Sequence, residues 1–191
     1  FDILFSTVGL ILFLPLYLII AFCIKIETKG PIFYIQNRVG KNGKIFKLYK
    51  FRSMYINSDG KGLITVGNND VRITNVGKFI RRYKLDELPQ LLNVLIGDMS
   101  IVGPRPEVEK YVMQYTDEQK IILSVKPGIT DYASIVYKNE NQELAHQDNP
   151  EQYYIMHIIP EKIKLNNIYI QNPHIGNYFK IIFLTIKKVF F

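Results

Sequence analysis

The chain has 191 residues, of which 48% are hydrophobic and 21% charged, which is enough for one folded domain and too apolar for a disordered segment. Its single cysteine, Cys23, excludes a disulfide framework and favours a reducing compartment. The three histidines lack the spacing of a zinc motif. The chain begins with Phe1 rather than Met, so we expect an excised or processed piece; whether residues precede Phe1 stays open.

The net charge of +7 is distributed in blocks. Residues 25–85 carry 14 basic and 3 acidic side chains, residues 86–161 carry 5 and 13, and residues 162–191 carry 5 and none. A basic block can bind nucleic acid, an anionic membrane surface or a phosphorylated small molecule. No nucleic-acid motif accompanies the lysines and aromatic residues of KIFKLYKF, which disfavours a nucleic-acid partner.

An uncharged apolar run of 22 residues extends from Ile3 to Ile24, long enough to cross a bilayer. It lacks the basic start and the cleavage site of a secretory signal, so we predict a retained membrane helix. Pro15 lacks an N–H and clashes with the carbonyl four residues earlier, which predicts a bend. Composition leaves two alternatives open, a kinked span and a hairpin that re-enters the same face, and the span is the commoner arrangement.

The next segments alternate between strand and helix patterns. Pro31 to Val39 and Lys44 to Phe51 are predicted strands of a hairpin, because the intervening GKNG suits a turn. A leucine stripe predicts a helix from Asp86 to Ile96 that ends at Gly97. Further on, residues 107–124 have a helical pattern with a break near Thr116, and residues 129–137 are predicted to form a strand.

The C-terminal part is amphipathic over residues 151–170 and 177–191, rich in Ile, Tyr and Phe with interspersed lysines. Such helices suit a membrane interface. Packing on the protein's own core is an equally good interpretation of the same pattern.

Asp86 and Glu87 are adjacent carboxylates at the start of a predicted helix, and three cations precede them within five residues. We expect both to be ionised. They can be an ordinary acidic first turn of a helix. Alternatively, one is a nucleophile or base while the other holds a divalent metal against a phosphate. Spacing alone leaves both interpretations open.

Arg105 stands between Pro104 and Pro106, which fix its backbone, so its guanidinium is preorganised to meet a phosphate or a base edge with two hydrogen bonds. An exposed arginine on a rigid turn is the alternative. Lys50 and Arg52 form a cationic strand end that can bind a diphosphate or simply keep the strand soluble. No GxGxxG or P-loop pattern is present, which disfavours nucleotide binding through those folds.

Taken in order, four segments resemble the bacterial sugar transferases, the monotopic polyprenyl-phosphate phosphoglycosyl transferases. They are FDILFSTVGLILFLPL, KGPIFYIQNRVGKNGKIFKLYKFRSM, KLDELPQLLNVLIGDMSIVGPRP and KPGIT. The resemblance implies transfer of a sugar-1-phosphate from a UDP-sugar to undecaprenyl phosphate, with release of UMP, as the first membrane step of polysaccharide or glycoconjugate synthesis. It also implies location at the bacterial inner membrane, with a re-entrant N-terminal helix and the catalytic domain facing the cytoplasm.

For the site, the resemblance implies that Asp86 is the nucleophile of a covalent intermediate and that Glu87, with Asp86, binds Mg²⁺. The substrate-binding residues it implies are Lys50, Arg52, Arg81, Pro104, Arg105, Pro106 and Lys138, with the Pro104–Pro106 loop against the nucleotide. Two positions depart from the family pattern. Leu14 stands where family members often have Ser, and residues 131–139 depart from the usual GWAQVNGRN, which puts Lys138 in place of a common arginine. Lysine supplies charge but no bidentate fork.

We therefore predict an α+β protein with a kinked, re-entrant membrane helix in residues 1–25 and a single compact catalytic domain with interfacial C-terminal helices in residues 26–191. The rival hypothesis is a non-catalytic scaffold of a glycan pathway that binds anionic membranes through its basic blocks. UMP release from a UDP-sugar distinguishes the two. The identity of the sugar and the formation of a homo-oligomer stay open.

Overall fold

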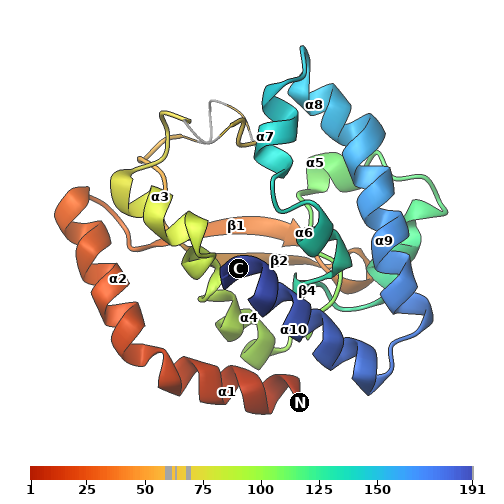
Figure 1. Cartoon of the computed structure of the whole chain (residues 1–191), viewed down its shortest axis with the longest axis horizontal. Coiled ribbons are helices and arrows are strands. Elements are labelled where there is room, and N and C mark those ends of the chain that lie inside the picture. Colours follow the sequence, from red (N-terminus) through yellow and green to blue (C-terminus); the bar gives the residue numbers. More distant parts are fainter. Residues whose placement is uncertain (59–61, 63, 68–69, 191) are drawn as a thin grey trace.

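The computed structural model describes residues 1–58, 62, 64–67 and 70–190, and it confirms a helix-rich chain with small sheets (Figure 1). The elements follow in chain order: α1 (Asp2–Leu12), α2 (Leu14–Glu27), β1 (Phe33–Val39), η1 (Lys41–Gly43), β2 (Ile45–Phe51), α3 (Asn75–Arg82), η3 (Leu85–Glu87), α4 (Gln90–Ile96), β3 (Ser100–Val102), α5 (Glu109–Val112), η4 (Gln119–Ser124), β4 (Gly128–Thr130), α6 (Tyr132–Val136), α7 (Glu140–Ala145), α8 (Pro150–Tyr153), η5 (Tyr154–Ile158), α9 (Ile159–Gln171) and α10 (Ile175–Phe190).

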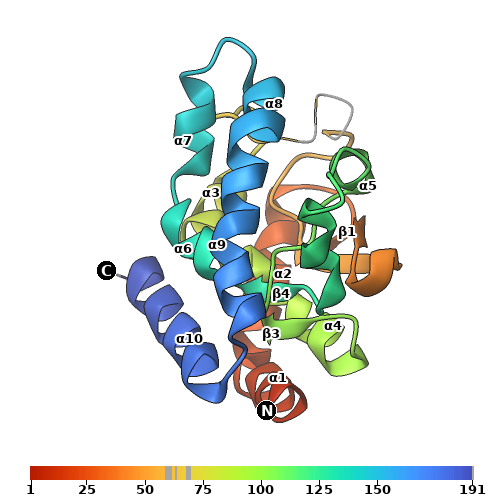
Figure 2. The same cartoon turned by 90° about the vertical axis from the view of Figure 1, so that its right-hand side faces the viewer.

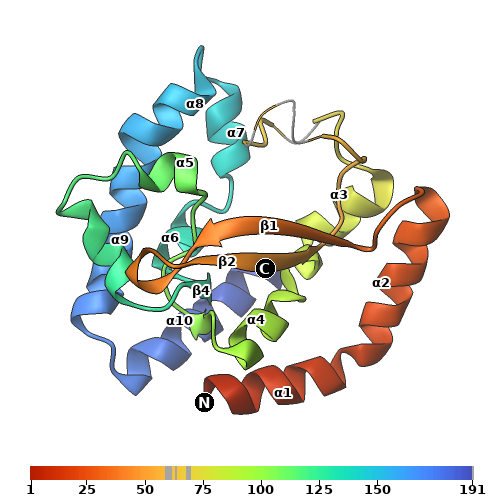
Figure 3. The same ribbon diagram turned by 180° about the vertical axis from the view of Figure 1, so that it is seen from behind.

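The predicted hairpin is confirmed: β1 and β2 pair antiparallel, with Phe33 opposite Phe51 and Val39 opposite Ile45. Asn42 and Gly43 adopt positive φ values of 57° and 76° in the turn, a conformation that these residue types tolerate best. One face of β2 buries Phe46 and Leu48 in a cluster with residues of α4 and the loop after it. The hairpin extends across the molecule in front of the helices when seen from behind (Figure 3).

The predicted helix over 86–96 divides into two parts. Leu85–Glu87 form a 3₁₀ turn, and α4 follows from Gln90. The predicted end is confirmed, because Gly97 adopts a φ of 98° and its N–H bonds to the carbonyls of Asn93 and Val94. The helix α4 packs against the strands β2 and β3, and β2 also contacts the 3₁₀ turn η3.

The predicted strand over 129–137 is wrong. Its first residues form β4, which pairs in parallel with β3, but α6 begins at Tyr132. The side chain of Asp131 accepts a hydrogen bond from the N–H of Ser134 and caps that helix, which ends the strand after Thr130. The break predicted near Thr116 is confirmed, because helical structure is interrupted between α5 and η4.

The two amphipathic C-terminal segments differ in what they pack against. From α8 to α9 the chain buries Ile158, Ile159 and Ile163 in the protein's own core, the second of the two alternatives that the sequence left open. The interfacial interpretation therefore does not hold for the buried face of residues 151–170. In contrast, α10 buries Ile181 on the domain and exposes Phe183 and Ile186.

The N-terminal run forms a bent pair of helices rather than one rod. Among the described residues, no single helix is long and apolar enough to cross a membrane; α1 and α2 satisfy that test only as a pair, bent by 60°. The break lies at Phe13, and Pro15 falls in the first turn of α2, which confirms the predicted bend. The pair forms an arc along the edge of the domain in Figure 1.

Polar contacts at both ends and at the middle hold this arc on the domain. The Asp2 carboxylate accepts hydrogen bonds from the N–H of Ile101 (3.1 Å) and the hydroxyl of Tyr178 in α10 (2.7 Å), so the beginning of α1 is bonded to the beginning of α10 (Figure 2). The Tyr17 hydroxyl donates to the carbonyl of Leu88 at 2.6 Å. Glu27 accepts from two backbone N–H groups at the start of α3. Both helices of the pair are thus bonded to the same domain.

Candidate active site

A cavity of about 890 Å³ lies between the β1–β2 hairpin, the 3₁₀ turn η3, the loop that contains Arg105 and Glu107, and the connection between α6 and α7. This volume lies within the usual range of small-molecule sites. Basic residues outnumber acidic ones in its lining, eleven to five. The cavity is therefore suited to a ligand that carries several negative charges.

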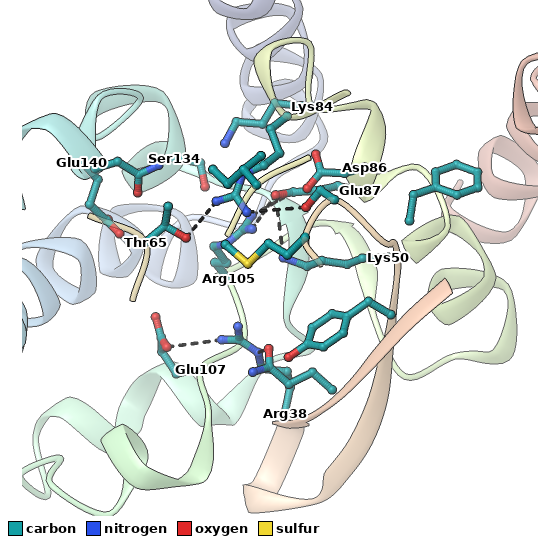
Figure 4. Close-up of a pocket in the computed structure, with 18 of the residues that line it drawn as sticks. Arg38, Lys50, Thr65, Lys84, Asp86, Glu87, Arg105, Glu107, Ser134 and Glu140 are labelled. Atoms are coloured by element: carbon teal, nitrogen blue, oxygen red, sulfur yellow. Dashed lines mark hydrogen bonds and ion pairs between the residues drawn. The ribbon is translucent and has the colours of Figure 1, made fainter. Parts of the chain in front are cut away.

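The 3₁₀ turn places two buried carboxylates on the cavity wall. Asp86 is 7% exposed and Glu87 is 8% exposed. Lys84 precedes the turn with a φ of 57°, and its carbonyl accepts the N–H of Glu87 at 3.2 Å. Because Lys84 is left-handed, the chain turns sharply between the basic end of α3 and the two acidic residues. Figure 4 shows the side chains of Asp86 and Glu87 next to each other.

The two carboxylates have different surroundings. Arg105 donates to both oxygens of Glu87, at 2.9 Å and 2.5 Å, and the Lys50 ammonium lies 3.9 Å away. Asp86 has no such fork, and within the described part of the chain its buried Oδ1 has no hydrogen-bond partner. One carboxylate is thus neutralised by the protein, and the other has a buried oxygen that no described residue binds.

These surroundings move the pKa values in opposite directions. Burial, with the charge of Glu87, raises the pKa of Asp86 above its ordinary value. Burial opposes ionisation of Glu87 too, but the charges of Arg105 and Lys50 outweigh it and hold the pKa of Glu87 well below its ordinary value. The two adjacent carboxylates therefore differ: Glu87 is held in its charged form, and Asp86 is the more basic of the pair.

Lys50 is the cation whose charge is most easily lost. Burial, together with the nearby positive charge of Arg105, lowers the pKa of Lys50 to about 7. Arg105 behaves in the opposite way, because the charge of Glu87 raises its pKa although burial opposes this. The two cations nearest Glu87 thus differ in whether they titrate near neutral pH.

The Arg105 loop is held by close backbone contact with the segment that contains β4. The N–H of Gly103 bonds to the carbonyl of Thr130 at 3.0 Å, and the N–H of Gly128 bonds to the carbonyl of Pro104 at 2.9 Å. A Cβ at Gly128 would lie 2.1 Å from the nitrogen of Gly103, so glycine is required there. The segments GPRP and KPGIT, separate in sequence, are therefore brought together.

The structure places the predicted substrate-binding residues unequally. Lys50, Arg81 and Arg105 line the cavity. Pro104 and Pro106 are buried and do not line this cavity themselves, but they restrict the backbone of Arg105, which does line it. That their loop lies against a nucleotide stays a prediction.

Arg52 and Lys138 also line the cavity, but they and Arg81 are already hydrogen-bonded to other parts of the protein. Arg52 donates from its terminal nitrogens to the carbonyls of Thr28 and Lys29, and it thereby fastens the end of α2. The ammonium of Lys138 donates to the carbonyl of Lys188 near the end of α10. Arg81 is held by the hydroxyl of Thr65 at 2.9 Å. Lys50 and Arg105 are therefore the predicted cations that lie directly against the carboxylates.

Sequence reasoning missed Arg38, Glu107 and Asp131, which also line the cavity. Arg38 of β1 donates to the carbonyl of Pro106 at 3.0 Å and pairs with Glu107 at 3.4 Å, away from Asp86 in Figure 4. Strand alternation could have put Gln36 and Arg38 on one face, but nothing in the pattern indicated which face. For Asp131, the only signal was the departure from GWAQVNGRN.

The carboxylates of Asp86 and Glu87 are possible ligands of a divalent cation in this cavity. Among the described residues, no cluster of three or more His, Cys, Asp or Glu side chains could hold a metal ion. Mg²⁺ is usually bound through one or two carboxylates together with substrate phosphates, and Asp86 offers an unpaired oxygen beside Glu87. The residues therefore fit Mg²⁺ as a partner of a bound phosphate, and they do not form a cage of their own.

Similar proteins identify the family of this chain. The family described as bacterial sugar transferase matches residues 1–191. A UDP-N-acetylgalactosamine-undecaprenyl-phosphate N-acetylgalactosaminephosphotransferase of Aeromonas hydrophila is 46% identical over 139 residues, which cover 71% of this chain and 33% of that protein. A UDP-glucose:undecaprenyl-phosphate glucose-1-phosphate transferase of Klebsiella pneumoniae is 40% identical over 193 residues, 99% of this chain and 39% of that protein.

A shorter relative, the uncharacterized sugar transferase EpsL of Bacillus subtilis (strain 168), is 39% identical over 166 residues, which cover 87% of this chain and 73% of that protein. The chain thus spans less than half the length of the Aeromonas and Klebsiella proteins.

Proposed function

The chain belongs to the bacterial sugar transferase family, and we propose that it transfers a sugar-1-phosphate from a UDP-sugar to undecaprenyl phosphate and releases UMP. The observation that carries this proposal is Asp86, a buried carboxylate on the cavity wall with one oxygen that no described residue binds. The names of the Aeromonas and Klebsiella relatives give the same two substrate classes for those proteins.

The reaction divides into two transfers. In the first, an Asp86 oxygen attacks the phosphorus that bears the sugar, the bond to the bridging oxygen breaks, and UMP leaves with that oxygen. In the second, an oxygen of the lipid phosphate attacks the same phosphorus and the Asp86 carboxylate is released. Water-soluble donor and lipid acceptor therefore need not be bound together. The raised pKa of Asp86 supports this role, because a more basic carboxylate is a stronger nucleophile once it is deprotonated.

The cations around Asp86 would stabilise the charge that develops on the departing UMP. Arg105 and Lys50 are held against Glu87, and Arg81 and Lys84 line the same cavity. Such preorganised charges need no rearrangement when the bond breaks. Mg²⁺, held by Asp86 and Glu87 together with the diphosphate, would add further neutralisation of the leaving group.

The bent helix pair would seat this site at a membrane. The apolar side chains that the pair exposes include Ile3, Leu4, Val8, Ile11, Leu12, Leu14, Leu18, Ile19, Phe22 and Ile26. A patch of this size is typical of a lipid or protein contact. We propose that the pair enters and leaves one face of the cytoplasmic membrane, because Asp2 and Glu27, at its two ends, are both bonded to the same domain.

The test combines nucleotide release with mass spectrometry. Purified protein in detergent is mixed with a panel of UDP-sugars, and UMP is measured; the donor that works identifies the sugar. With donor alone, the intact protein should gain the mass of one phosphosugar, and Asp86→Asn should abolish both the adduct and turnover, a loss of about 10⁴-fold or more. The same variant should remain folded.

Two outcomes would contradict the mechanism: turnover by the wild type without an adduct under any quench, or near-normal rates in Asp86→Asn. Protein that binds anionic vesicles but releases no UMP from any UDP-sugar would instead favour the non-catalytic scaffold.

A further inference from the structure

Asp131 is a buried carboxylate, 3% exposed, that bonds to three separate segments. Its Oδ2 accepts from the backbone N–H of Arg105 at 2.9 Å and from the Asn166 side chain of α9 at 2.7 Å. Its Oδ1 accepts from the N–H of Ser134 at 2.6 Å. A buried carboxylate is costly unless its oxygens are hydrogen-bonded, and three donors satisfy this one.

The bond to Arg105 is directly linked to the candidate active site. The backbone N–H of Arg105 donates to Asp131, while its guanidinium donates to both carboxylate oxygens of Glu87. Pro106 restricts the residue before it to extended conformations, so little rotation remains within the loop. What remains is displacement of the whole loop relative to α6 and α9, and the Asp131 contacts with both elements oppose it.

We propose that Asp131 is a positioning residue of the transfer reaction: it fixes the Arg105 loop to α6 and α9, so that the guanidinium meets Glu87 in its forked geometry. Asp131 does not act on the substrate itself, because its oxygens are already occupied by Arg105, Ser134 and Asn166. The residue lies in the segment that departs from the family's usual GWAQVNGRN. The inference rests on the proposed function for its rate measurements.

A purely structural role is the alternative, since the bond between Asp131 and Asn166 also ties α6 to α9. A paired substitution separates the two roles. In Asp131→Ala the N–H of Arg105 and the side-chain amide of Asn166 both lose their acceptor. In Asp131→Asn with Asn166→Asp, the new amide donates to the new carboxylate, which restores that bond at unchanged net charge. The N–H of Arg105 still has no acceptor.

For the positioning role we expect Asp131→Ala to lower kcat about 10²-fold, the usual cost of misplacing a catalytic group by about 1 Å, with a smaller change in the KM for the donor. The melting temperature should fall as well. The double variant should recover the melting temperature but not kcat. Recovery of both, or full kcat in Asp131→Ala, would overturn the proposal.

A second measurement does not depend on activity. Asp131 and Glu87 both contact Arg105 and not each other, so a double-mutant cycle of Asp131→Ala and Glu87→Gln reports coupling through Arg105. We expect the losses in melting temperature to be smaller together than their sum. Strictly additive losses would refute the coupling. If the wild type releases no UMP from any UDP-sugar, the proposed function fails, and this cycle still decides on Asp131.

Discussion

The cavity and the bent helix pair both invert the usual distribution of polarity, in opposite directions. In the cavity, Asp86 and Glu87 are more than nine-tenths buried, whereas in the helix pair Ile11 is 70% exposed and Phe22 is 66% exposed. Each inversion costs free energy in water. The comparison therefore indicates what each region is built to contact: charged ligands in the cavity, and an apolar surface along the helix pair.

The two regions are also stabilised differently. In the cavity, charged side chains are bonded to one another: Arg105 donates hydrogen bonds to both Glu87 and Asp131. The helix pair is held by hydrogen bonds from side chains far apart in the sequence, such as Asp2 and Tyr17. A single substitution should therefore disturb the cavity more than the helix pair, and the following experiments test that difference.

The largest effect among these is expected for Glu87→Gln. The amide removes the charge that Arg105 and Lys50 neutralise, and it replaces one acceptor oxygen of the fork by a donor. We expect kcat/KM for UMP release to fall about 10² to 10³-fold, as for loss of a preorganised electrostatic contact, and the requirement for added Mg²⁺ to rise. The measurement is a Mg²⁺ titration of initial rates with a chelator blank.

The matched control is Glu107→Gln, which removes a second carboxylate from the same cavity, one paired with Arg38 rather than Arg105. Its kcat/KM should fall less and its Mg²⁺ requirement should stay the same. Full activity of the wild type in excess chelator would remove the metal from the mechanism.

A smaller effect, visible only as a change with pH, is expected for Lys50→Arg. The Lys50 ammonium exists below its pKa of about 7, so kcat/KM should be highest on the acid side of that value and fall as pH rises, by up to about tenfold per pH unit. Asp86 must be deprotonated to attack, and its raised pKa sets the opposite limb.

Arginine stays charged throughout this range, so Lys50→Arg should remove the alkaline limb even if its maximal rate is lower. Lys47→Arg, on the same strand with an exposed side chain, is the control and should leave the profile unchanged. An alkaline limb that persists at the same pH in Lys50→Arg would assign it to another group.

The smallest effect is expected for Pro15→Ala in the helix pair. Alanine restores the N–H that proline lacks and favours a straighter helix, but the bonds of Asp2 and Tyr17 to the domain still oppose straightening. We expect only a minor fraction of molecules to move residue 1 to the outer face. Phe1→Cys in a Cys23→Ser background, labelled on intact cells with an impermeant reagent, measures that fraction.

The parent with Pro15 should remain unlabelled from outside and become labelled after the cells are opened. Labelling of the parent on intact cells would show that the pair spans the membrane, and would contradict the re-entrant proposal.

Local patterns were sufficient for much of the fold. The glycines and asparagine of the hairpin turn, the bend near Pro15 and the end of α4 at Gly97 were all predicted, because each depends on the backbone preferences of residues close together in sequence. The strand predicted over residues 129–137 failed because one capping side chain, Asp131, outweighed the apolar pattern.

The sequence by itself determined which residue types were available for the site: two adjacent carboxylates, an arginine between prolines and an uncharged N-terminal run. Only the tertiary structure decided their roles, because hydrogen bonds and burial depend on segments far apart in the chain. It pairs Glu87 with Arg105, leaves an oxygen of Asp86 unbonded, engages Lys138 elsewhere and holds Asp2 against α10. Two carboxylates that are equivalent in sequence become chemically different because only one of them meets an arginine.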